Sequence, residues 1–205
     1  MKRSEEIINI LSEHITPKCE LDFKNNYQLL CAVMLSAQTT DKSVNLVTPE
    51  LFLKYPSFVE LAKANIVDIS NIIKRLGLVT KKSENLIGIA KTIIEKFDGN
   101  IPNTLSELTT LPGVGRKTAS VVLALGFNIP AFPVDTHVSR VAKRLSMAKE
   151  SDDVLEIEEK LRRNIKKEMW IDSHHLMLLF GRYHCTSKNP KCEECYLKAY
   201  CKYKA

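Results

Sequence analysis

A lysine that follows a glycine-rich turn is the residue best suited to chemistry in this sequence. Lys117 ends the segment LPGVGRK, whose glycines, Gly113 and Gly115, permit backbone angles and close approaches that a side chain would prevent. A helix that begins directly after the turn presents unpaired backbone N–H groups and a positive dipole end, a natural site for a phosphate. The helix start and partial burial both disfavour the ammonium form of Lys117, which makes its amine more nucleophilic.

The turn differs from other glycine motifs that bind phosphates. A P-loop has four residues between its first glycine and its Gly-Lys pair, whereas Val114 alone separates the two glycines here. A dinucleotide-binding fingerprint would need a strand before it. For two glycines alone, a tight turn between helices is the better interpretation, and most lysines are solvated surface residues. The full string, with Arg116 and Lys117 at a helix start, is more specific.

An aspartate lies 18 residues beyond Lys117, in the segment Val134-Asp135-Thr136-His137. Its position favours a helix cap, because the side chain of an aspartate accepts hydrogen bonds from the first backbone N–H groups of a helix. Taken alone, Asp135 is therefore predicted to cap a helix that begins near Thr136.

Four cysteines lie within the last 21 residues, with the spacing C-x6-C-x2-C-x5-C. Without a secretory signal, such clustering favours metal binding over disulfides. The spacing leaves the metal open, because structural zinc sites commonly use two short cysteine pairs and iron–sulfur clusters accept variable spacing. Several lysines accompany the cysteines, so a phosphate-binding loop and a solvated basic tail are both compatible with the segment. The four cysteines are Cys185, Cys192, Cys195 and Cys201, and Cys19 and Cys31 are expected to be ordinary thiols.

The elements that must position these residues are predicted to be helices throughout. Apolar residues recur at helical spacing in the stretches 7–15, 69–76, 86–97 and 138–145, and no alternating strand pattern is found. The runs 27–37 and 118–125 are apolar nearly all round, as in fully buried helices. Ser57 and Glu60 form a capping-box pattern, and Gly77 and Gly99 are placed to end helices. The sequence therefore predicts an all-α fold.

Three prolines and one charge pattern carry further expectations. Pro49 lies inside a helical stretch and predicts a kink or a break. The segment IPAFPV, which contains Pro130 and Pro133, is the best internal boundary. Glu158 and Glu159 precede Arg162 and Arg163 by four residues, a pattern that supports an exposed helix.

Length and composition suit one large domain or two small ones in a soluble protein. The chain has 205 residues, is 44% hydrophobic and carries a formal charge of +6, which weakly favours a polyanionic partner. No apolar run approaches the roughly 20 residues of a membrane span. Acidic residues interrupt the N-terminal segment MKRSEEIINIL, so we expect no signal peptide and a cytoplasmic location.

Three motifs, in this order, resemble the endonuclease III family, which comprises bifunctional DNA glycosylases of the helix-hairpin-helix superfamily. These motifs are LPGVGRKTA, VDTHVSRV and the four-cysteine segment. Two further matches extend the likeness over essentially the full chain: LSAQTTD, from Leu35 to Asp41, and Gly77-Leu78. The resemblance implies two helical lobes with a DNA cleft between them. Residues 22–132 would form a six-helix barrel domain with the helix-hairpin-helix at about 105–125. Residues 1–21 and 133–205 would form an iron–sulfur cluster domain with its cluster loop at 185–201.

The resemblance also implies an activity and its site. Lys117 and Asp135 match the catalytic pair, and the four cysteines match the ligands of a [4Fe-4S] cluster. The chain would excise oxidised pyrimidines from double-stranded DNA and cut abasic sites by β-elimination through a lysine Schiff base, as a monomer associated with the nucleoid and with no membrane. The implied DNA contacts are Gln38, which fills the gap left by a flipped nucleotide, Leu78, which acts as a wedge, and Leu111, Gly113, Val114, Gly115, Arg116, His137, Lys188 and Lys191.

Departures from the family's sequence pattern, and alternative protein classes, bear on which substrate this chain would act on. After Gly77-Leu78 the family usually has an aromatic residue and an asparagine, whereas this chain has Val79 and Thr80, which leaves the contacts of the wedge loop open. Adenine and thymine-mismatch glycosylases of the superfamily lack the lysine. The adenine enzyme also uses a carboxylate where this chain has Ala32. A non-catalytic DNA-binding hairpin module would need neither Asp135 nor a cluster, and a metal-stabilised interaction protein would leave Lys117 unexplained.

Overall fold

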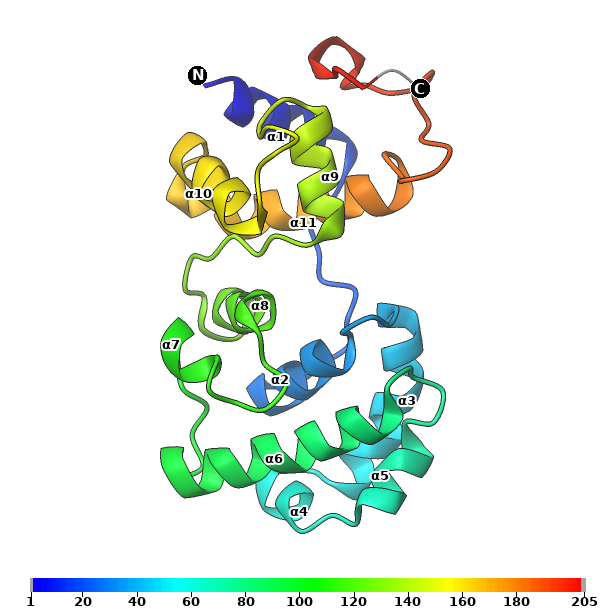
Figure 1. Cartoon of the computed structure of the whole chain (residues 1–205), viewed down its shortest axis with the longest axis vertical. Coiled ribbons are helices and arrows are strands. Elements are labelled where there is room, and N and C mark those ends of the chain that lie inside the picture. Colours follow the sequence, from blue (N-terminus) through cyan, green and yellow to red (C-terminus); the bar gives the residue numbers. More distant parts are fainter. Residues whose placement is uncertain (1, 204–205) are drawn as a thin grey trace. The chain divides into compact units, whose positions relative to one another are not determined.

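The computed structural model describes residues 2–203, and these residues form helices joined by turns and loops, with no strand among them. The all-α prediction is confirmed. The chain divides into two compact units (Figure 1). We call Glu20–Ile129 the continuous unit, and the residues up to Cys19 together with those from Pro130 onward the composite unit. The change of unit falls at the start of the proline-rich IPAFPV segment.

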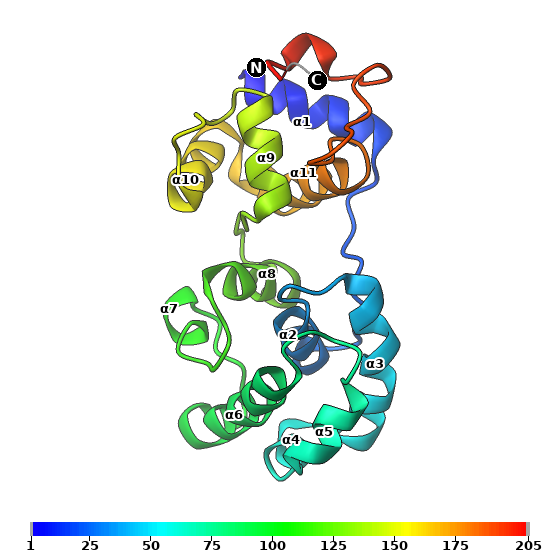
Figure 2. The same ribbon diagram turned by 45° about the vertical axis from the view of Figure 1, so that its right-hand side comes forward.

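The continuous unit is built around one buried helix. In α2 (Asn26–Leu35) every residue from Leu29 to Leu35 is buried, as its all-round apolar sequence predicts. Helices α3, α6 and α8 pack on it (Figure 2). The remaining helices pack on α6, α8 or α3. The helices around α2 are α3 (Asp41–Lys54), α4 (Phe58–Ala62), α5 (Ile66–Ile72), α6 (Val79–Phe97), α7 (Leu105–Leu108) and α8 (Arg116–Phe127).

One sequence expectation for this unit fails, and another is answered in part. Helix α3 continues through Pro49, so of the predicted kink or break the break does not occur; the proline removes one hydrogen bond while the turns on both sides still pack on the core. Helix α5 ends at Ile72, well before Gly77, so this glycine does not terminate it. By contrast, Gly99 follows the end of α6 with φ of 79° and donates its N–H to the carbonyl of Ile93, as predicted.

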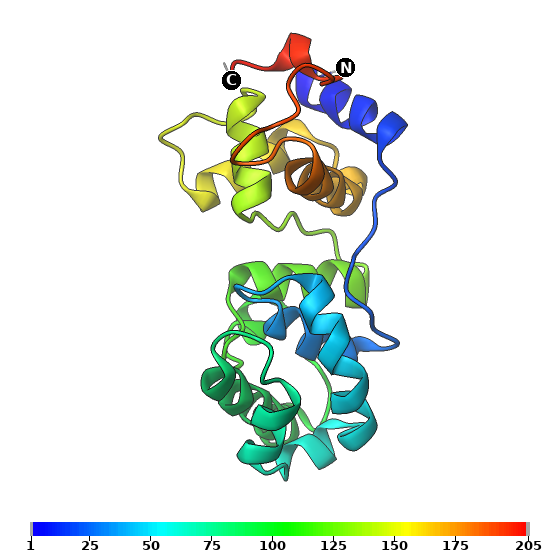
Figure 3. The same ribbon diagram turned by 90° about the vertical axis from the view of Figure 1, so that its right-hand side faces the viewer.

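The composite unit joins the two ends of the chain. Helix α11 (Trp170–Tyr183) packs against α1 (Arg3–His14) and α9 (Thr136–Arg144), and α10 (Val154–Asn164) packs on α1 and α9. The final segment, which contains the short helix η2 (Lys198–Tyr200), lies beside α1 (Figure 3). There His14 stacks on Tyr196 with ring centroids 4.0 Å apart, and the Arg3 guanidinium donates to the carbonyl of Tyr200 at 2.8 Å.

Helix α10 agrees with its charge pattern except on one face. Arg162 pairs with Glu158 at 3.3 Å one turn away, as expected, but Glu158 is buried. Arg162 also lies over the ring of Trp170, which closes that side of the helix. Most of α10 is exposed, as the pattern predicts, and its face at Glu158 is covered at the start of α11.

Candidate functional site

The glycine turn joins α7 to α8 in the continuous unit and forms a compact hairpin. The side chains of Leu111 and Val114 are buried, and Val114 donates its N–H to the carbonyl of Leu111 at 3.1 Å. These two residues therefore anchor the turn from inside. Gly115 is the N-cap of α8 and has no side chain to accept from the amides of the first turn, so the helix start remains suited to an external acceptor such as a phosphate.

Gly113 is required at the tip of this hairpin for two reasons. Its φ of 73° lies in the left-handed region, which residues with a side chain rarely adopt. In addition, a Cβ atom at this position would lie 2.2 Å from Nδ2 of Asn85 on α6. The hairpin thus packs directly on α6 through Asn85, and its two glycines, Gly113 and Gly115, are exposed.

Lys117 is the second residue of α8 and is half-buried. The four residues that follow Thr118 on this helix are Ala119, Ser120, Val121 and Val122, all of them buried. The helix is therefore fixed by its core face, and it holds the lysine at the mouth of the hairpin, beside the amides of its own first turn.

Asp135 is the N-cap of α9, in the composite unit. Its Oδ1 atom accepts the backbone N–H groups of His137 and Val138, both at 2.9 Å. The capping prediction is confirmed. The second carboxylate oxygen, Oδ2, makes no hydrogen bond with any residue in the described part of the chain, and the side chain is only half-buried. One oxygen of Asp135 is thus available for another task.

His137 lies at the same helix start, and a neighbouring arginine fixes which of its ring nitrogens accepts a hydrogen bond. Its Nδ1 atom lies 3.2 Å from a guanidinium nitrogen of Arg140. Because a guanidinium only donates, Nδ1 must accept, and the proton of a neutral ring lies on Nε2. Arg140 itself donates to the carbonyls of Gly181 and Cys185. The arginine thereby joins α9 to the end of α11 and to the first residue of the cysteine segment.

Gln38 and Leu78 lie in two loops of the continuous unit and have the same unusual backbone. Their φ angles are 54° and 58°, in the left-handed region that residues with a side chain rarely adopt. Both side chains are exposed, and Leu78 retains 58% of its accessible surface. An exposed leucine on a strained backbone, at the first turn of α6, is poorly explained by stability alone.

Lys82 connects these two loops, and the sequence interpretation missed it. It is only 3% exposed, and its Nζ atom donates to Oγ1 of Thr39 at 2.6 Å, while its backbone N–H bonds to the carbonyl of Leu78. Burial lowers the pKa of this lysine. The signal was present: Lys82 occupies the core stripe of α6 with Leu86 and Ile89, where an apolar residue is expected.

The four cysteines line one cavity of the composite unit, together with apolar and aromatic side chains such as Leu145, Phe180 and Tyr203. Short turns bring the thiols to it. Cys195 donates its N–H to the carbonyl of Cys192, and Arg144 donates to Sγ of Cys185 at 3.3 Å.

The donor set of the cavity suits a metal cluster. Within residues 2–203 no group of three His, Cys, Asp or Glu side chains is arranged to hold a single metal ion. Zinc would require all four sulfurs about 2.3 Å from one centre, whereas an iron–sulfur cluster takes its four thiolates on separate iron atoms. The donor set and the apolar lining therefore agree with a cluster. Lys188 and Lys191 are exposed on the loop between the first two cysteines.

Comparison with known proteins bears on both units. Residues 31–167 match the HhH-GPD superfamily of base excision DNA repair proteins, and residues 185–201 match the iron–sulfur binding domain of endonuclease III. Endonuclease III of Bacillus subtilis is 45% identical over 90% of this chain and 84% of its own length. The Rickettsia felis enzyme is 44% identical over 92% of this chain and 88% of its own. The chain belongs to the endonuclease III family.

A solved structure of the endonuclease III family agrees over nearly the whole chain. A trapped covalent intermediate of endonuclease III with DNA matches with a TM-score of 0.92 and 41% identity, covering 98% of this chain and 97% of its own. The chain is accordingly a base excision DNA glycosylase with abasic-site lyase activity, and its cofactor is a [4Fe-4S] cluster. Of the helices in residues 2–203, none has the length and apolar character to cross a membrane.

Proposed function

We propose that Lys117 is the nucleophile of this endonuclease III family member and that Asp135 moves its protons. The amine of Lys117 attacks C1′ of the deoxyribose, and the bond between C1′ and the base breaks with its electrons leaving on the base, which takes up a proton. The nitrogen loses one proton to the Asp135 carboxylate or to water, the C1′–O4′ bond breaks as O4′ takes up a proton, and a protonated Schiff base joins lysine to C1′. The unbonded Oδ2 of Asp135 supports this assignment, because the residue can assist without giving up its cap.

The lyase step follows from the same imine. Loss of a proton from C2′ sends electrons toward the iminium nitrogen, and the C3′–O bond then breaks with the 3′ phosphate leaving. Water finally hydrolyses the imine and frees the lysine. A carboxylate at Asp135 also stabilises the positive charge that develops on the sugar.

The hairpin and the two exposed loops supply the binding side of the proposal. The amides at Gly113, Gly115 and Arg116 hold a phosphate without reading sequence, because the hairpin presents backbone there. The damaged nucleotide is extruded from the duplex. Gln38 then fills the vacated space and Leu78 wedges beside it. His137, through Nε2, and the loop lysines Lys188 and Lys191 add phosphate contacts.

The remaining parts of the proposal concern domains, substrate and location. The continuous unit corresponds to the barrel domain and the composite unit to the cluster domain. Cys185, Cys192, Cys195 and Cys201 ligate the cluster. The substrates are double-stranded DNA containing oxidised or ring-saturated pyrimidines, such as thymine glycol, and abasic sites. The enzyme acts as a monomer in the cytoplasm, associated with the nucleoid.

Borohydride trapping tests the assignment of the nucleophile. The holoenzyme is mixed with an oligonucleotide duplex containing thymine glycol and reduced, so that the imine becomes a stable amine. We expect a covalent adduct with the native chain and none with Lys117→Gln, which should still bind a duplex with a non-cleavable abasic analogue. An adduct that persists in Lys117→Gln would disprove the assignment, and trapping only on mismatched thymine or adenine would disprove the substrate class.

A further inference from the structure

The composite unit has a strongly basic concavity that no part of the proposed function uses. It lies where α9 ends and is bounded by α10 and the last described residues of the chain. Six cationic side chains line it against one carboxylate, Glu150, a formal surplus of five charges in a chain whose net charge is +6. The six cations come from three separate segments and are Lys143, Arg144, Lys149, Lys160, Arg163 and Lys202.

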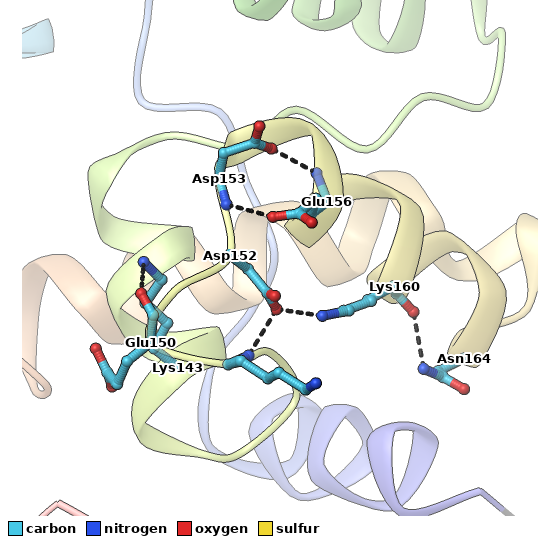
Figure 4. Close-up of polar contacts among 8 residues, drawn as sticks. Lys143, Glu150, Asp152, Asp153, Glu156, Lys160 and Asn164 are labelled. Carbon is cyan, nitrogen blue, oxygen red and sulfur yellow. Dashed lines mark hydrogen bonds and ion pairs between the residues drawn. The ribbon is translucent and has the colours of Figure 1, made fainter.

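Three of these cations are held in place by the fold. Lys143 donates its Nζ to the carbonyl of Glu150 at 2.8 Å, and Lys160 pairs with the buried carboxylate of Asp152 at 2.5 Å (Figure 4). Asp152 also accepts the backbone N–H of Lys149, which ties the loop after α9 to α10. Arg144 is fixed by a bond to the carbonyl of Thr186 at 2.8 Å. These cations therefore need little ordering before they bind an anion.

The rim of the concavity is built differently. Lys149, Arg163 and Lys202 are exposed, and their side-chain nitrogens make no ion pair among residues 2–203. Ser146, which also lines the concavity, has φ of 58° and a buried Oγ atom with no hydrogen-bond partner in the same range. Buried hydroxyls nearly always have partners. A fixed basic floor, an exposed basic rim and an unpartnered hydroxyl together describe a site for an oxyanion.

We propose that this concavity binds a phosphodiester group of the DNA backbone away from the lesion. Nucleic acid fits it better than a small anion because the cations spread over three segments in an open depression, as a continuous polyanion requires. Helix α9 has nine residues, so its Asp135 end lies about 13 Å from the concavity at a rise of about 1.5 Å per residue. At about 3.4 Å per nucleotide, the contacted phosphates lie roughly four or more nucleotides from the lesion.

The test compares the holoenzyme with a triple variant, Lys149→Gln, Arg163→Gln and Lys202→Gln. Binding to a duplex of about 30 base pairs carrying a non-cleavable abasic analogue is measured against salt concentration, and we expect the slope of log K to fall by about 2 to 3. A matched control removes three exposed lysines that do not line the concavity, Lys63, Lys166 and Lys167. This control should retain the native slope.

Neutral methylphosphonate linkages then locate the contact. Placed roughly four to six nucleotides from the lesion, they should weaken binding of the native chain about tenfold and leave the triple variant unaffected. Equal weakening of both proteins, or an unchanged slope in the triple variant, would overturn the proposal. A third result would also overturn it. If inorganic phosphate raised the melting temperature of the native chain but not of the triple variant, while the triple variant kept the native slope of log K for DNA against salt, the ligand would be a small anion.

Discussion

At the scale of single residues, Asp135 combines two roles that mutagenesis can separate. Its Oδ1 atom caps α9 through two backbone N–H groups, and Oδ2 is available to the proposed chemistry. Asparagine caps a helix about as well as aspartate, because its side-chain oxygen accepts the same hydrogen bonds. Asparagine cannot act as a base. Substitution at this one position therefore distinguishes the structural role from the chemical one.

We expect Asp135→Asn to keep its free energy of unfolding within about 0.5 kcal/mol of the native value. Single-turnover base release should fall about 10²- to 10⁴-fold, the usual contribution of a positioned general base. Asp135→Ala should lose a further 1 kcal/mol or so of stability, because it also removes the cap. Denaturant titration measures the change in stability, and rapid-quench kinetics measure base release. A native rate of base release in Asp135→Asn would show that the residue acts only as a helix cap.

Gly113 provides a second prediction at this scale. In Gly113→Ala, the positive φ and the contact with Asn85 should together destabilise the protein by about 1–3 kcal/mol. Adding Asn85→Ala removes the clash and leaves the backbone strain, so the double variant should recover part of the loss. Thermal unfolding of Gly113→Ala and of the double variant measures this. Full recovery of stability in the double variant would show that the φ angle costs nothing.

At the scale of elements, α6 links the loop of Leu78 to the loop of Gln38 through Lys82. The buried Nζ of Lys82 donates to Oγ1 of Thr39, and this hydroxyl in turn donates to the carbonyl of Ala37. A buried ammonium with a single hydroxyl partner is an expensive way to stabilise a fold, because desolvation opposes the charge. The contact is better explained as fixing the spacing of two loops that are proposed to enter DNA together.

Lys82→Met should therefore separate stability from activity. The variant should unfold at the native temperature or above it, since the desolvated charge is gone, whereas base excision should fall about 10- to 100-fold, the worth of a hydrogen bond to a charged group. The fall should appear in kcat on a lesion in a paired duplex and be smaller on a bare abasic site. Thr39→Val should reproduce this fall in kcat but also lower the melting temperature, because it leaves the buried ammonium of Lys82 without its hydroxyl partner. In Lys82→Met, a loss of melting temperature in proportion to activity would contradict a positioning role.

The same lysine predicts the sign of a pH effect. Burial lowers the pKa of Lys82 in the folded state, so between the folded pKa and the higher unfolded pKa the unfolded chain binds more protons. Stability should then rise with pH through that alkaline window. Urea titrations of the native chain and Lys82→Met should diverge there. If the stabilities of the two proteins changed in parallel with pH through this window, the assigned pKa direction for Lys82 would be wrong.

Elements were easier to predict from the sequence than the contacts between them. The buried helices α2 and α8 follow from runs of apolar residues, and the hairpin follows from its glycines. Gly77 does not end a helix and Pro49 does not break one, because a local preference gives way when packing holds the neighbouring turns. Lys82 was missed because a lysine on a core stripe has no local signal for its partner, which lies 43 residues away in the chain.

At the scale of the whole molecule, the cysteine cavity belongs to the core of the composite unit. Leu145 and Phe180 line it and also pack in that core. Metal binding at such a place contributes directly to folding. The cluster is therefore expected to hold the last segment of the chain against α1 and α9, as well as shaping the loop that carries Lys188 and Lys191.

Replacing Cys195 with serine should test this coupling. The purified variant should lose the brown colour and visible absorption of the native protein, melt at a lower temperature and become open to proteolysis between residues 186 and 203. Cys19→Ser, outside the cavity, is the control and should keep its colour. A colourless native preparation with stoichiometric zinc would refute the cluster, and a variant as protease-resistant as the native chain would refute the structural coupling.

The contacts of α1 with the final segment have a consequence for how the chain is made. Ile7, Ile8 and Leu11 are buried in the composite unit, but α11 and the cysteine segment leave the ribosome last. At roughly 5–20 residues per second, α1 waits on the order of ten seconds or more for its partners while the continuous unit is already complete. During translation its apolar stripe is therefore open to chaperones, and a nascent chain stalled before residue 170 would hold a finished hairpin beside an unfolded N-terminus.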